Sequence, residues 1–219
     1  MVEIARQIET SAPFVPGKQK VLFINNQDSF VYNLVNYICT TSEAKVKVVP
    51  NTITLAEVNA FEPDKIFISP GPGHPKYETG SVIPIIREFS PKMPIFGVCL
   101  GHQAICEAFG KDEKTEYVGR ANVGPKHGKM SRIFHDGESI FKDIPNPISV
   151  VRYHSLAAKA DLLARELKIT SMADDGTIMG VRHVKYETHG VQFHPESIVM
   201  RPHGMRMIAN FLKINMEKP

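Results

Sequence analysis

A cysteine between two glycines, in the segment Gly97-Val98-Cys99-Leu100-Gly101, has the spacing of a nucleophile elbow. In such an elbow a sharp turn between a strand and a helix carries the nucleophile, and small residues nearby avoid the clashes that a Cβ atom would cause. The N-terminus of the following helix would favour the Cys99 thiolate and leave amide hydrogens free for an oxyanion. The same spacing also fits a buried core cysteine beside helix-packing glycines. Cys99 is therefore a candidate nucleophile that needs a second group to support it.

The segment His194-Pro195-Glu196 offers the base that a cysteine nucleophile needs. It follows the apolar run 190–193, and in an extended chain residues two apart point to the same side. His194 and Glu196 would then reach one site together, with Pro195 limiting the freedom of the backbone. By itself a His-x-Glu pair more often belongs to a surface turn. Beside an elbow it completes a candidate triad, because the base is usually oriented by a third group.

A loop of alternating proline and glycine, Ser69-Pro70-Gly71-Pro72-Gly73-His74-Pro75, directly follows an expected strand. Such a loop is stiff, and its amides can approach a ligand closely because glycine has no side chain. Ligands bind α/β sheets beyond the carboxyl ends of the strands, which is where this loop would lie. Taken alone, it would be interpreted as a tight surface turn.

Short apolar runs alternate with helical patterns through the first half of the chain. The expected strands are residues 20–25, 45–49, 65–69 and 94–98, and the expected helices are residues 30–38, 54–61, 81–89 and 101–109. Asp28 or Ser29 is the expected cap of the first helix. Strands separated by helices indicate a parallel sheet that is covered on both faces.

From about Glu116 the pattern changes to short strand-like runs, at 148–153, 167–171, 177–181 and 190–193, with a final helix over about 204–214. The expected fold is therefore a doubly wound, mostly parallel α/β sheet of the flavodoxin-like type. Helices cover both of its faces, and an antiparallel portion is added in the C-terminal half. Pro13, Pro16 and Gly17 mark residues 1–18 as an N-terminal extension, so residues 19–219 are expected to form one domain.

Composition narrows the class of function. Apolar residues make up 42% and charged residues 22%, as in ordinary soluble proteins, and the net charge of +3 does not indicate nucleic-acid binding. No apolar run approaches the ~18 residues that cross a bilayer, and charges interrupt the N-terminus where a signal peptide would be apolar. Three cysteines are an odd number, which argues against a disulfide framework. This count fits a protein of the reducing cytoplasm. The nine histidines show no metal-binding spacing, so no metal is expected.

The remaining candidate groups are interpreted as structural. Cys39 lies on an apolar helical face and Cys106 lies two turns beyond Cys99, so both are expected in the core. His102 is expected on the helix surface or facing a partner. His154 either orders a substrate loop or is a structural histidine.

Four motifs, in the order PGPG, GVCLGHQ, YHSL and GVQFHPES, resemble the class I, triad-type glutamine amidotransferase family. The resemblance covers residues 20–214. Within that family, NNQDSFVYNL near the start and HGK at 127–129 resemble anthranilate synthase component II, and the glutaminase of p-aminobenzoate synthase is similar. The resemblance implies hydrolysis of L-glutamine to glutamate and ammonia, without a cofactor or a metal.

The resemblance also implies a role for each matching residue. Cys99 would attack the glutamine carboxamide and form a glutamyl thioester, with His194 as base and then acid and Glu196 holding its imidazole. The amides of Gly73 and Leu100 would form the oxyanion hole. The residues implied in substrate binding are Gly71, Pro72, Gly73, Leu100, Gln103, Ser155 and Leu156. Ammonia would pass to a chorismate-using synthase, separate or fused, in tryptophan biosynthesis.

One motif departs from the family. Asn25 and Gln27 stand where the family has aspartate and tyrosine, in a region expected near the synthase interface. Three alternatives stay open: the glutaminase of aminodeoxychorismate (p-aminobenzoate) synthase in folate biosynthesis, a glutaminase that serves another acceptor, and a non-catalytic regulatory or scaffold subunit of the same fold. The intact set of Cys99, His194 and Glu196 argues against the last.

Overall fold

The computed structural model of the protein describes residues 19–121 and 123–216. Its centre is a mixed sheet, whose strand order within the described residues is β2-β1-β3-β4-β11-β10-β9-β6-β7. The parallel part consists of β2 (Lys45–Pro50), β1 (Lys20–Asn25), β3 (Lys65–Ile68), β4 (Ile95–Val98) and β11 (Thr188–Val191). This order is that of the flavodoxin-like doubly wound fold, so the predicted fold class is confirmed. The extension predicted for residues 1–18 lies outside the described residues.

An antiparallel portion continues the sheet beyond β11, as predicted. It consists of β10 (Ile178–His183), β9 (Leu167–Ala173), β6 (Lys126–His135) and β7 (Ile148–His154). Two further short strands, β5 (Val118–Arg120) and β8 (Leu156–Ala158), pair with each other. The sequence does not predict β6, because its residues KHGKMSRIFH lack a regular apolar alternation. Pairing with β7 on one side and β9 on the other provides its backbone hydrogen bonds.

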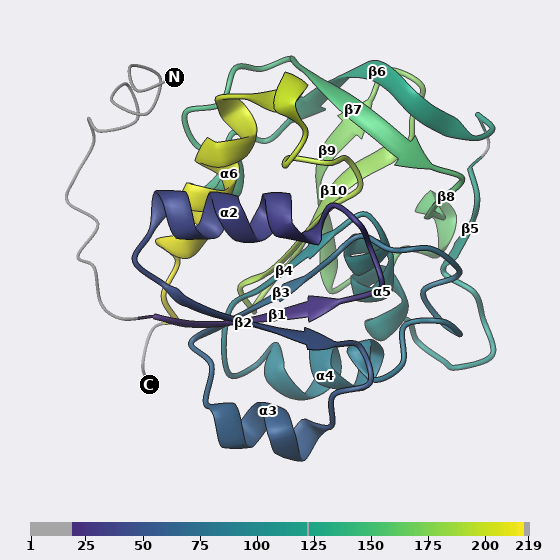
Figure 1. Ribbon diagram of the computed structural model, residues 1–219. Helices are drawn as coiled ribbons and strands as arrows, with labels where there is room; N and C mark the ends of the chain where they lie inside the picture. The colour runs from purple at the N-terminus through teal and green to yellow at the C-terminus, as the bar shows by residue number, and fades with distance from the viewer. Residues whose placement is uncertain (1–18, 122, 217–219) are drawn as a thin grey trace.

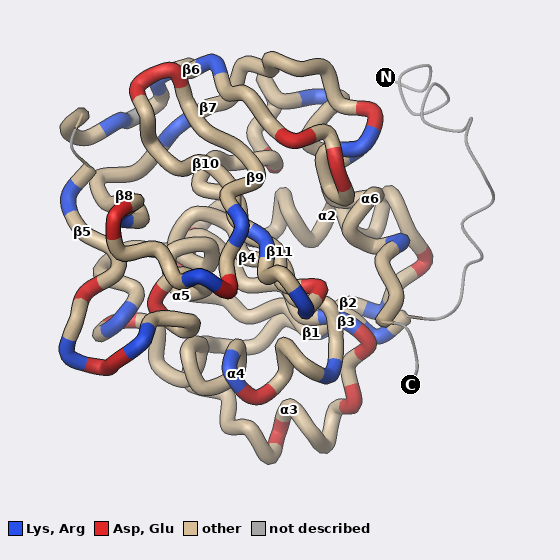
Figure 2. The backbone as a smooth tube through the Cα atoms, turned by 180° about the vertical axis from the view of Figure 1, so that it is seen from behind, with Lys and Arg blue, Asp and Glu red and all other residues tan. Residues whose placement is uncertain are grey.

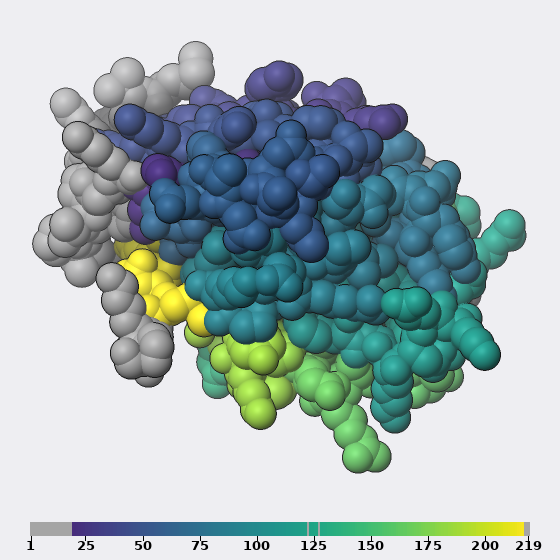
Figure 3. All heavy atoms as spheres, turned by 90° about the horizontal axis from the view of Figure 1, so that it is seen from below, coloured from purple at the N-terminus to yellow at the C-terminus, as the bar shows by residue number. Residues whose placement is uncertain are grey.

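Helices cover both faces of the parallel strands (Figure 1). One layer consists of α2 (Val31–Thr41) and α6 (His203–Leu212), and the other of α3 (Leu55–Phe61), α4 (Val82–Phe89) and α5 (Leu100–Ala108). In the part of the chain that the structure describes, 3-10 helices lie in the connections as η1 (Ser139–Phe141), η2 (Ala160–Leu162) and η3 (Ile198–Met200). Seen from below, the segments that carry α3 and α4 form much of the molecular surface (Figure 3).

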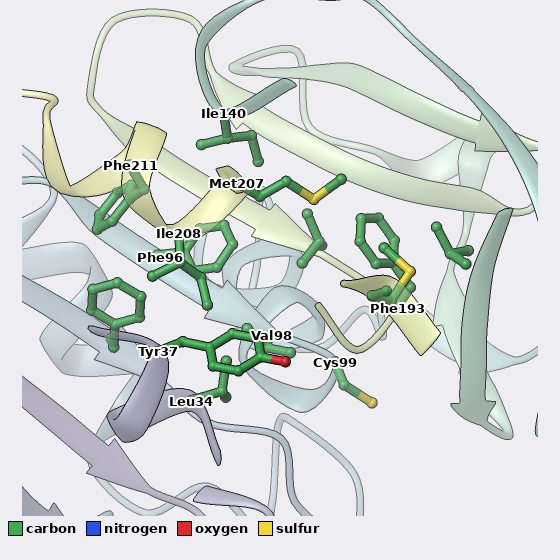
Figure 4. Close-up of a cluster of buried hydrophobic side chains, with 14 of the residues drawn as sticks. Leu34, Tyr37, Phe96, Val98, Cys99, Ile140, Phe193, Met207, Ile208 and Phe211 are labelled. Atoms are coloured by element: carbon green, nitrogen blue, oxygen red, sulfur yellow. The ribbon is translucent and has the colours of Figure 1, made fainter. Parts of the chain in front are cut away.

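The strand β1 shows why the sheet needs helices on both sides. Val21 and Phe23 pack into the cluster that includes α2 and α6, whereas Leu22 and Ile24 pack into the cluster that includes α3, α4 and α5. Successive side chains of a strand point to opposite faces, so an unbroken apolar run avoids water only between two layers. Figure 4 shows the first cluster, with the Cys99 sulfur at its edge and pointing away from its centre.

The starts of two helices differ in how they are capped. Thr54 and Glu57 form a capping box at α3, in which each side chain accepts the other residue's amide hydrogen, at 3.2 and 2.8 Å. Helix α2 follows Phe30 without a side-chain cap, so the predicted cap at Asp28 or Ser29 is wrong. Asp28 instead accepts the Phe30 amide at 2.7 Å, in a tight turn before the helix.

The loops after β1 and β3 meet at the carboxyl edge of the sheet. The chain leaves β1 toward β2 on one side, and β3 lies on its other side, so the strand order reverses here. The Asn26 backbone amide donates to Oγ of Ser69 at 2.8 Å, and its side-chain Nδ2 donates to the Ser69 carbonyl at 3.0 Å. This reversal point is where doubly wound sheets bind ligands.

Candidate active site

Cys99 stands at the junction of β4 and α5, in a backbone conformation that is rare for a residue with a side chain. Its φ is 53°, in the left-handed region that favours glycine. A Cβ atom at Gly97 would lie 2.5 Å from the Gly101 backbone, and one at Gly101 would lie 2.6 Å from the Ile68 carbonyl oxygen. The sharp turn and the close glycine contacts predicted around Cys99 are both present.

A cavity of about 390 Å³ borders Cys99. Its walls come from segments far apart in the sequence. They are Asp28, Phe30, Asn33, Pro70, Gly71, Cys99, Tyr153, His194, Glu196, Ser197 and Ile198. Cys99 is only 6% exposed, so its sulfur is shielded from bulk water. The cavity has the size of a small-molecule site and contains the three residues of the predicted triad.

His194 and Glu196 form a buried pair, with His194 Nδ1 2.6 Å from Glu196 Oε1. The extended chain predicted through these residues is wrong, because β11 ends at Val191 and Pro195 and Glu196 lie in a turn. The Ser197 amide donates to the His194 carbonyl at 3.2 Å and closes that turn. Proline suits this position since it has no amide hydrogen to satisfy. The turn, not strand alternation, brings the two side chains together.

The charge state of His194 is set by its neighbours. Burial alone would lower the pKa of its imidazole, but Cys99 and the Glu196 carboxylate together raise the pKa well above its ordinary value. The second ring nitrogen, Nε2, is buried and makes no hydrogen bond among the described residues. One nitrogen of a histidine in the cavity wall is therefore fixed by a carboxylate, and the other has no partner among the described residues, an arrangement that suits a general base.

The predicted glycine loop lies beside the start of α5. Pro70 and Gly71 line the cavity, whereas Pro72 and Gly73 do not. A Cβ atom at Gly71 would lie 2.5 Å from the Asn26 carbonyl oxygen, so the loop passes this backbone too closely for a side chain. Gly73 has a φ of +89°, a conformation that favours glycine. Leu100 is the first residue of α5, where amides lack partners within the helix.

Three other predicted substrate-binding residues do not line the cavity. Gln103 lies behind Cys99, where its Nε2 donates to the Leu156 carbonyl and to Gln192 Oε1, both at 3.0 Å. Ser155 is exposed, and its carbonyl accepts the Ala121 amide at 3.0 Å. The structure thus brings Gln103 and Leu156 together but leaves Ser155 at the surface.

Sequence reasoning missed two residues that lie at the site. The Nε2 atom of Gln192 donates to the Cys99 sulfur at 3.6 Å, and Asp28 lines the cavity. Burial raises the pKa of the Asp28 carboxyl, which lies close enough to His194 and Glu196 to interact with their charges. Gln192 stands two residues before His194 in the GVQFHPES motif, and that position was a usable signal. From the sequence, Asp28 is expected only as a helix cap.

The two residues that depart from the family motif lie near the cavity but not in its wall. Asn25 is the last residue of β1, and its Oδ1 accepts the Asp28 amide at 3.1 Å. Gln27 is exposed and has a φ of 62°. These residues shape the turn that carries Asp28 and leave Cys99, His194 and Glu196 without a direct change.

Two structural expectations outside the cavity are wrong. Cys39 is exposed, because it lies on the side of α2 that turns away from the sheet. His102 is fully buried, because the α5 surface that carries it packs against Gly190. Cys106 is buried as expected, and burial raises the pKa of its thiol. His154 is buried and hydrogen bonded at both nitrogens.

The described residues contain no group of His, Cys, Asp or Glu side chains arranged to hold a metal ion. Among the same residues, no helix has the length and apolar character of a membrane span. Lys and Arg are interspersed with Asp and Glu along the backbone (Figure 2).

The family model of class-I glutamine amidotransferases matches residues 22–215. The chain belongs to this family, and the predicted resemblance is confirmed. In fold it is similar to a crystal structure from Thermoplasma acidophilum that is assigned as a GMP synthase subunit. The TM-score is 0.77 at 24% identity, over 90% of this chain and 93% of the other.

Curated relatives specify the type within the family. Anthranilate synthase component 2 of Methanocaldococcus jannaschii is 53% identical over 203 residues, which cover 89% of this chain and 97% of the relative. Aminodeoxychorismate synthase component 2 of Escherichia coli is 43% identical, over 88% and 98%. A multifunctional tryptophan biosynthesis protein of Pichia angusta is 46% identical over 91% of this chain, which spans 52% of that longer protein. The chain is a glutamine amidotransferase of the anthranilate or aminodeoxychorismate synthase type.

Proposed function

We propose that this chain hydrolyses L-glutamine to glutamate and ammonia, with Cys99 as nucleophile, His194 as base and acid, and Glu196 as the group that holds His194. The observation that carries the proposal is the buried His194–Glu196 hydrogen bond of 2.6 Å, beside a cysteine in a strained elbow at the wall of one cavity. A nucleophile, a base and an orienting acid are the parts that covalent amide hydrolysis needs.

The proposed reaction has two steps. The Cys99 sulfur attacks the carboxamide carbon of glutamine, His194 gives its proton to the departing nitrogen, and ammonia leaves behind a glutamyl thioester. His194 then takes a proton from water, whose oxygen attacks the thioester carbon, and the Cys99 thiolate leaves as glutamate forms. The amides of Gly73 and Leu100 hold the oxyanion in both steps. The reaction as written needs no cofactor and no metal.

The residues proposed to bind glutamine are Gly71, Pro72, Gly73, Leu100, Gln103, Ser155 and Leu156. Gly71 supports this assignment best, because it borders the cavity within reach of Cys99. Gln103 and Leu156 act from behind the nucleophile, through the hydrogen bond that joins them.

The ammonia passes to a chorismate-using synthase, as a separate subunit or a fused segment, for anthranilate formation in tryptophan biosynthesis. The names of the M. jannaschii and P. angusta relatives support this pathway. The alternative is p-aminobenzoate synthesis for folate, which the E. coli relative supports. Exposed large apolar side chains support docking of a partner here. Phe30 and Ile198, in the cavity wall, are 57% and 75% exposed, and Tyr32 and Val199, close to them in the sequence, are 71% and 56% exposed.

Residues 19–219 form the amidotransferase domain of this proposal, and residues 1–18 form its extension. The family match over residues 22–215 supports the first boundary. The chemistry requires Cys99 as a free thiol, which suits the reducing cytoplasm.

Glutamate release from glutamine, with and without a chorismate-using synthase, tests the proposal. We expect the synthase to stimulate release by the native chain and to have no effect on Cys99→Ser. The aromatic product formed by the stimulated pair identifies the pathway. A native chain that binds the synthase but releases no glutamate would instead be a non-catalytic scaffold.

A further inference from the structure

Gln192 lies directly behind the proposed nucleophile, and its side chain is fully buried. Its Nε2 atom donates to the Cys99 sulfur at 3.6 Å, and its Oε1 atom accepts from Nε2 of Gln103 at 3.0 Å. Burying an amide is costly unless its polar atoms are paired, so both contacts help to keep Gln192 in place. They join Cys99 to Gln103, one turn further along α5.

The direction of this chain of hydrogen bonds is set at its far end, by Arg152. A guanidinium can only donate, so its Nε, 3.0 Å from His154 Nε2, makes that nitrogen an acceptor. Burial lowers the pKa of His154 to about 4, and the imidazole is therefore neutral near pH 7. Its one proton must lie on Nδ1, which donates to the Leu156 carbonyl at 2.8 Å.

The Leu156 carbonyl fixes the next amide in turn. A carbonyl oxygen can only accept, so the atom of Gln103 that lies 3.0 Å from it is the NH₂ group. The other hydrogen of this group points to Gln192, whose nearer atom must be its oxygen. The Gln192 nitrogen is thereby left on the side of Cys99, where it can only donate.

We propose that Gln192 stabilises the Cys99 thiolate as a hydrogen-bond donor. Its orientation is fixed by the series of hydrogen bonds that runs from Arg152 through His154, Leu156 and Gln103. The inference rests on the proposed function and gives the nucleophile a second supporting group besides His194. A hydrogen bond to an ionised group is about twice as strong as one between neutral groups, so this donor favours the thiolate over the thiol.

Alkylation of Cys99 by iodoacetamide across a pH series tests this role, with peptide mapping to separate Cys99 from the other cysteines. Gln192→Leu removes the donor and the acceptor without adding charge, whereas Gln192→Glu keeps an acceptor for Gln103, removes the donor and adds a negative charge. We expect the pH of half-maximal alkylation to rise by about one unit in Gln192→Leu. It should rise further in Gln192→Glu, whose carboxylate repels the thiolate.

Thr188→Val is the matched control, because Thr188 is equally buried, lies at the far end of β11, and its hydroxyl has no partner among the described residues. Its alkylation profile should match that of the native protein. The Gln192 variants should hydrolyse glutamine with a kcat about tenfold below that of the native protein and with little change in KM. Unmoved profiles in folded Gln192 variants would overturn the inference. A native chain that releases no glutamate would overturn the proposed function instead.

Discussion

The imidazole of His194 and the carboxylate of Glu196 meet at 2.6 Å in a turn that shields both side chains from water. Burial opposes the charged imidazole, but Cys99 and this contact together raise the pKa of His194. We expect Glu196→Gln to lower kcat for glutamine hydrolysis by about 10²–10⁴-fold, because an amide no longer stabilises the imidazolium. Steady-state glutamate release measures the effect.

The chain offers a matched control in Glu187, which contacts His189 at 2.9 Å near the opposite end of β11. Glu187→Gln removes the same kind of histidine–carboxylate bond far from Cys99, and its glutaminase activity should remain native. If Glu187→Gln and Glu196→Gln lost the same activity, the His194–Glu196 pair would contribute only to stability and not to catalysis.

The elbow glycines are expected to be sensitive to a single added methyl group. Gly101→Ala would place a Cβ atom 2.6 Å from the Ile68 carbonyl, and backbone cannot move away as a flexible side chain can. We expect the free energy of unfolding to fall by about 1–3 kcal/mol, as for overpacked cores, together with loss of activity. Urea denaturation measures the change. Gly119→Ala is the control: its Cβ would meet only the mobile end of the Lys159 side chain, and a stability loss as large there would refute the explanation.

Much of the fold was predictable because the parallel strands are buried on both faces. Runs such as Val21–Ile24 are apolar at every position, and this pattern indicates a sheet between two helical layers. The strand β6 was not predictable, since Met130 and Phe134 are about half exposed while Ile133 is buried, so its pattern does not separate core from surface. Its place in the sheet depends on pairing with β7 and β9, which are distant in sequence.

The residues of the candidate site were predictable where their signal lies within one short motif. The glycines beside Cys99 identify the nucleophile, and the His-x-Glu spacing identifies His194 and Glu196. Gln192 and Asp28 were not identified, because their contacts with the site arise from tertiary packing that brings β11 and the loop after β1 to the same edge. Ser155 shows the reverse case, a motif residue that the structure leaves exposed outside the cavity wall.

The buried histidine His102 should make the protein sensitive to acid. Burial lowers the pKa of His102 to about 3, so between that pH and its ordinary value of 6.5 the unfolded chain binds a proton that the folded chain does not. The stability of the folded state therefore falls as the pH drops through this range, by about 1.4 kcal/mol per pH unit from this residue.

Urea denaturation at a series of pH values checks this expectation in the native protein and in His102→Leu. The variant should lose stability less steeply below about pH 6, because the leucine takes up no proton in the unfolded chain. Parallel curves for the two proteins would show that His102 does not contribute to the acid sensitivity.

The exposed apolar residues of η3, Ile198 in the cavity wall and Val199 beside it, should be needed for partner docking but not for basal hydrolysis. We expect Val199→Glu to weaken binding of the chorismate-using synthase by about tenfold, because a charge would then be buried at the interface. Val184→Glu is the control, since Val184 is equally exposed, at 57% against 56% for Val199, but follows β10 at the opposite end of the sheet. Isothermal titration of the two variants with the synthase compares them. Equal weakening by both substitutions would place the interface elsewhere.

The role of Cys99 in releasing ammonia is tested by comparing two nitrogen sources in Cys99→Ser bound to the synthase. If Cys99 is the nucleophile that releases ammonia from glutamine, the variant complex makes no aromatic amine from glutamine. It still forms the product at the native rate from added ammonium salt. Loss of both activities to the same extent would rule out this role, because it would show that Cys99 supports the structure of the complex and not glutamine hydrolysis.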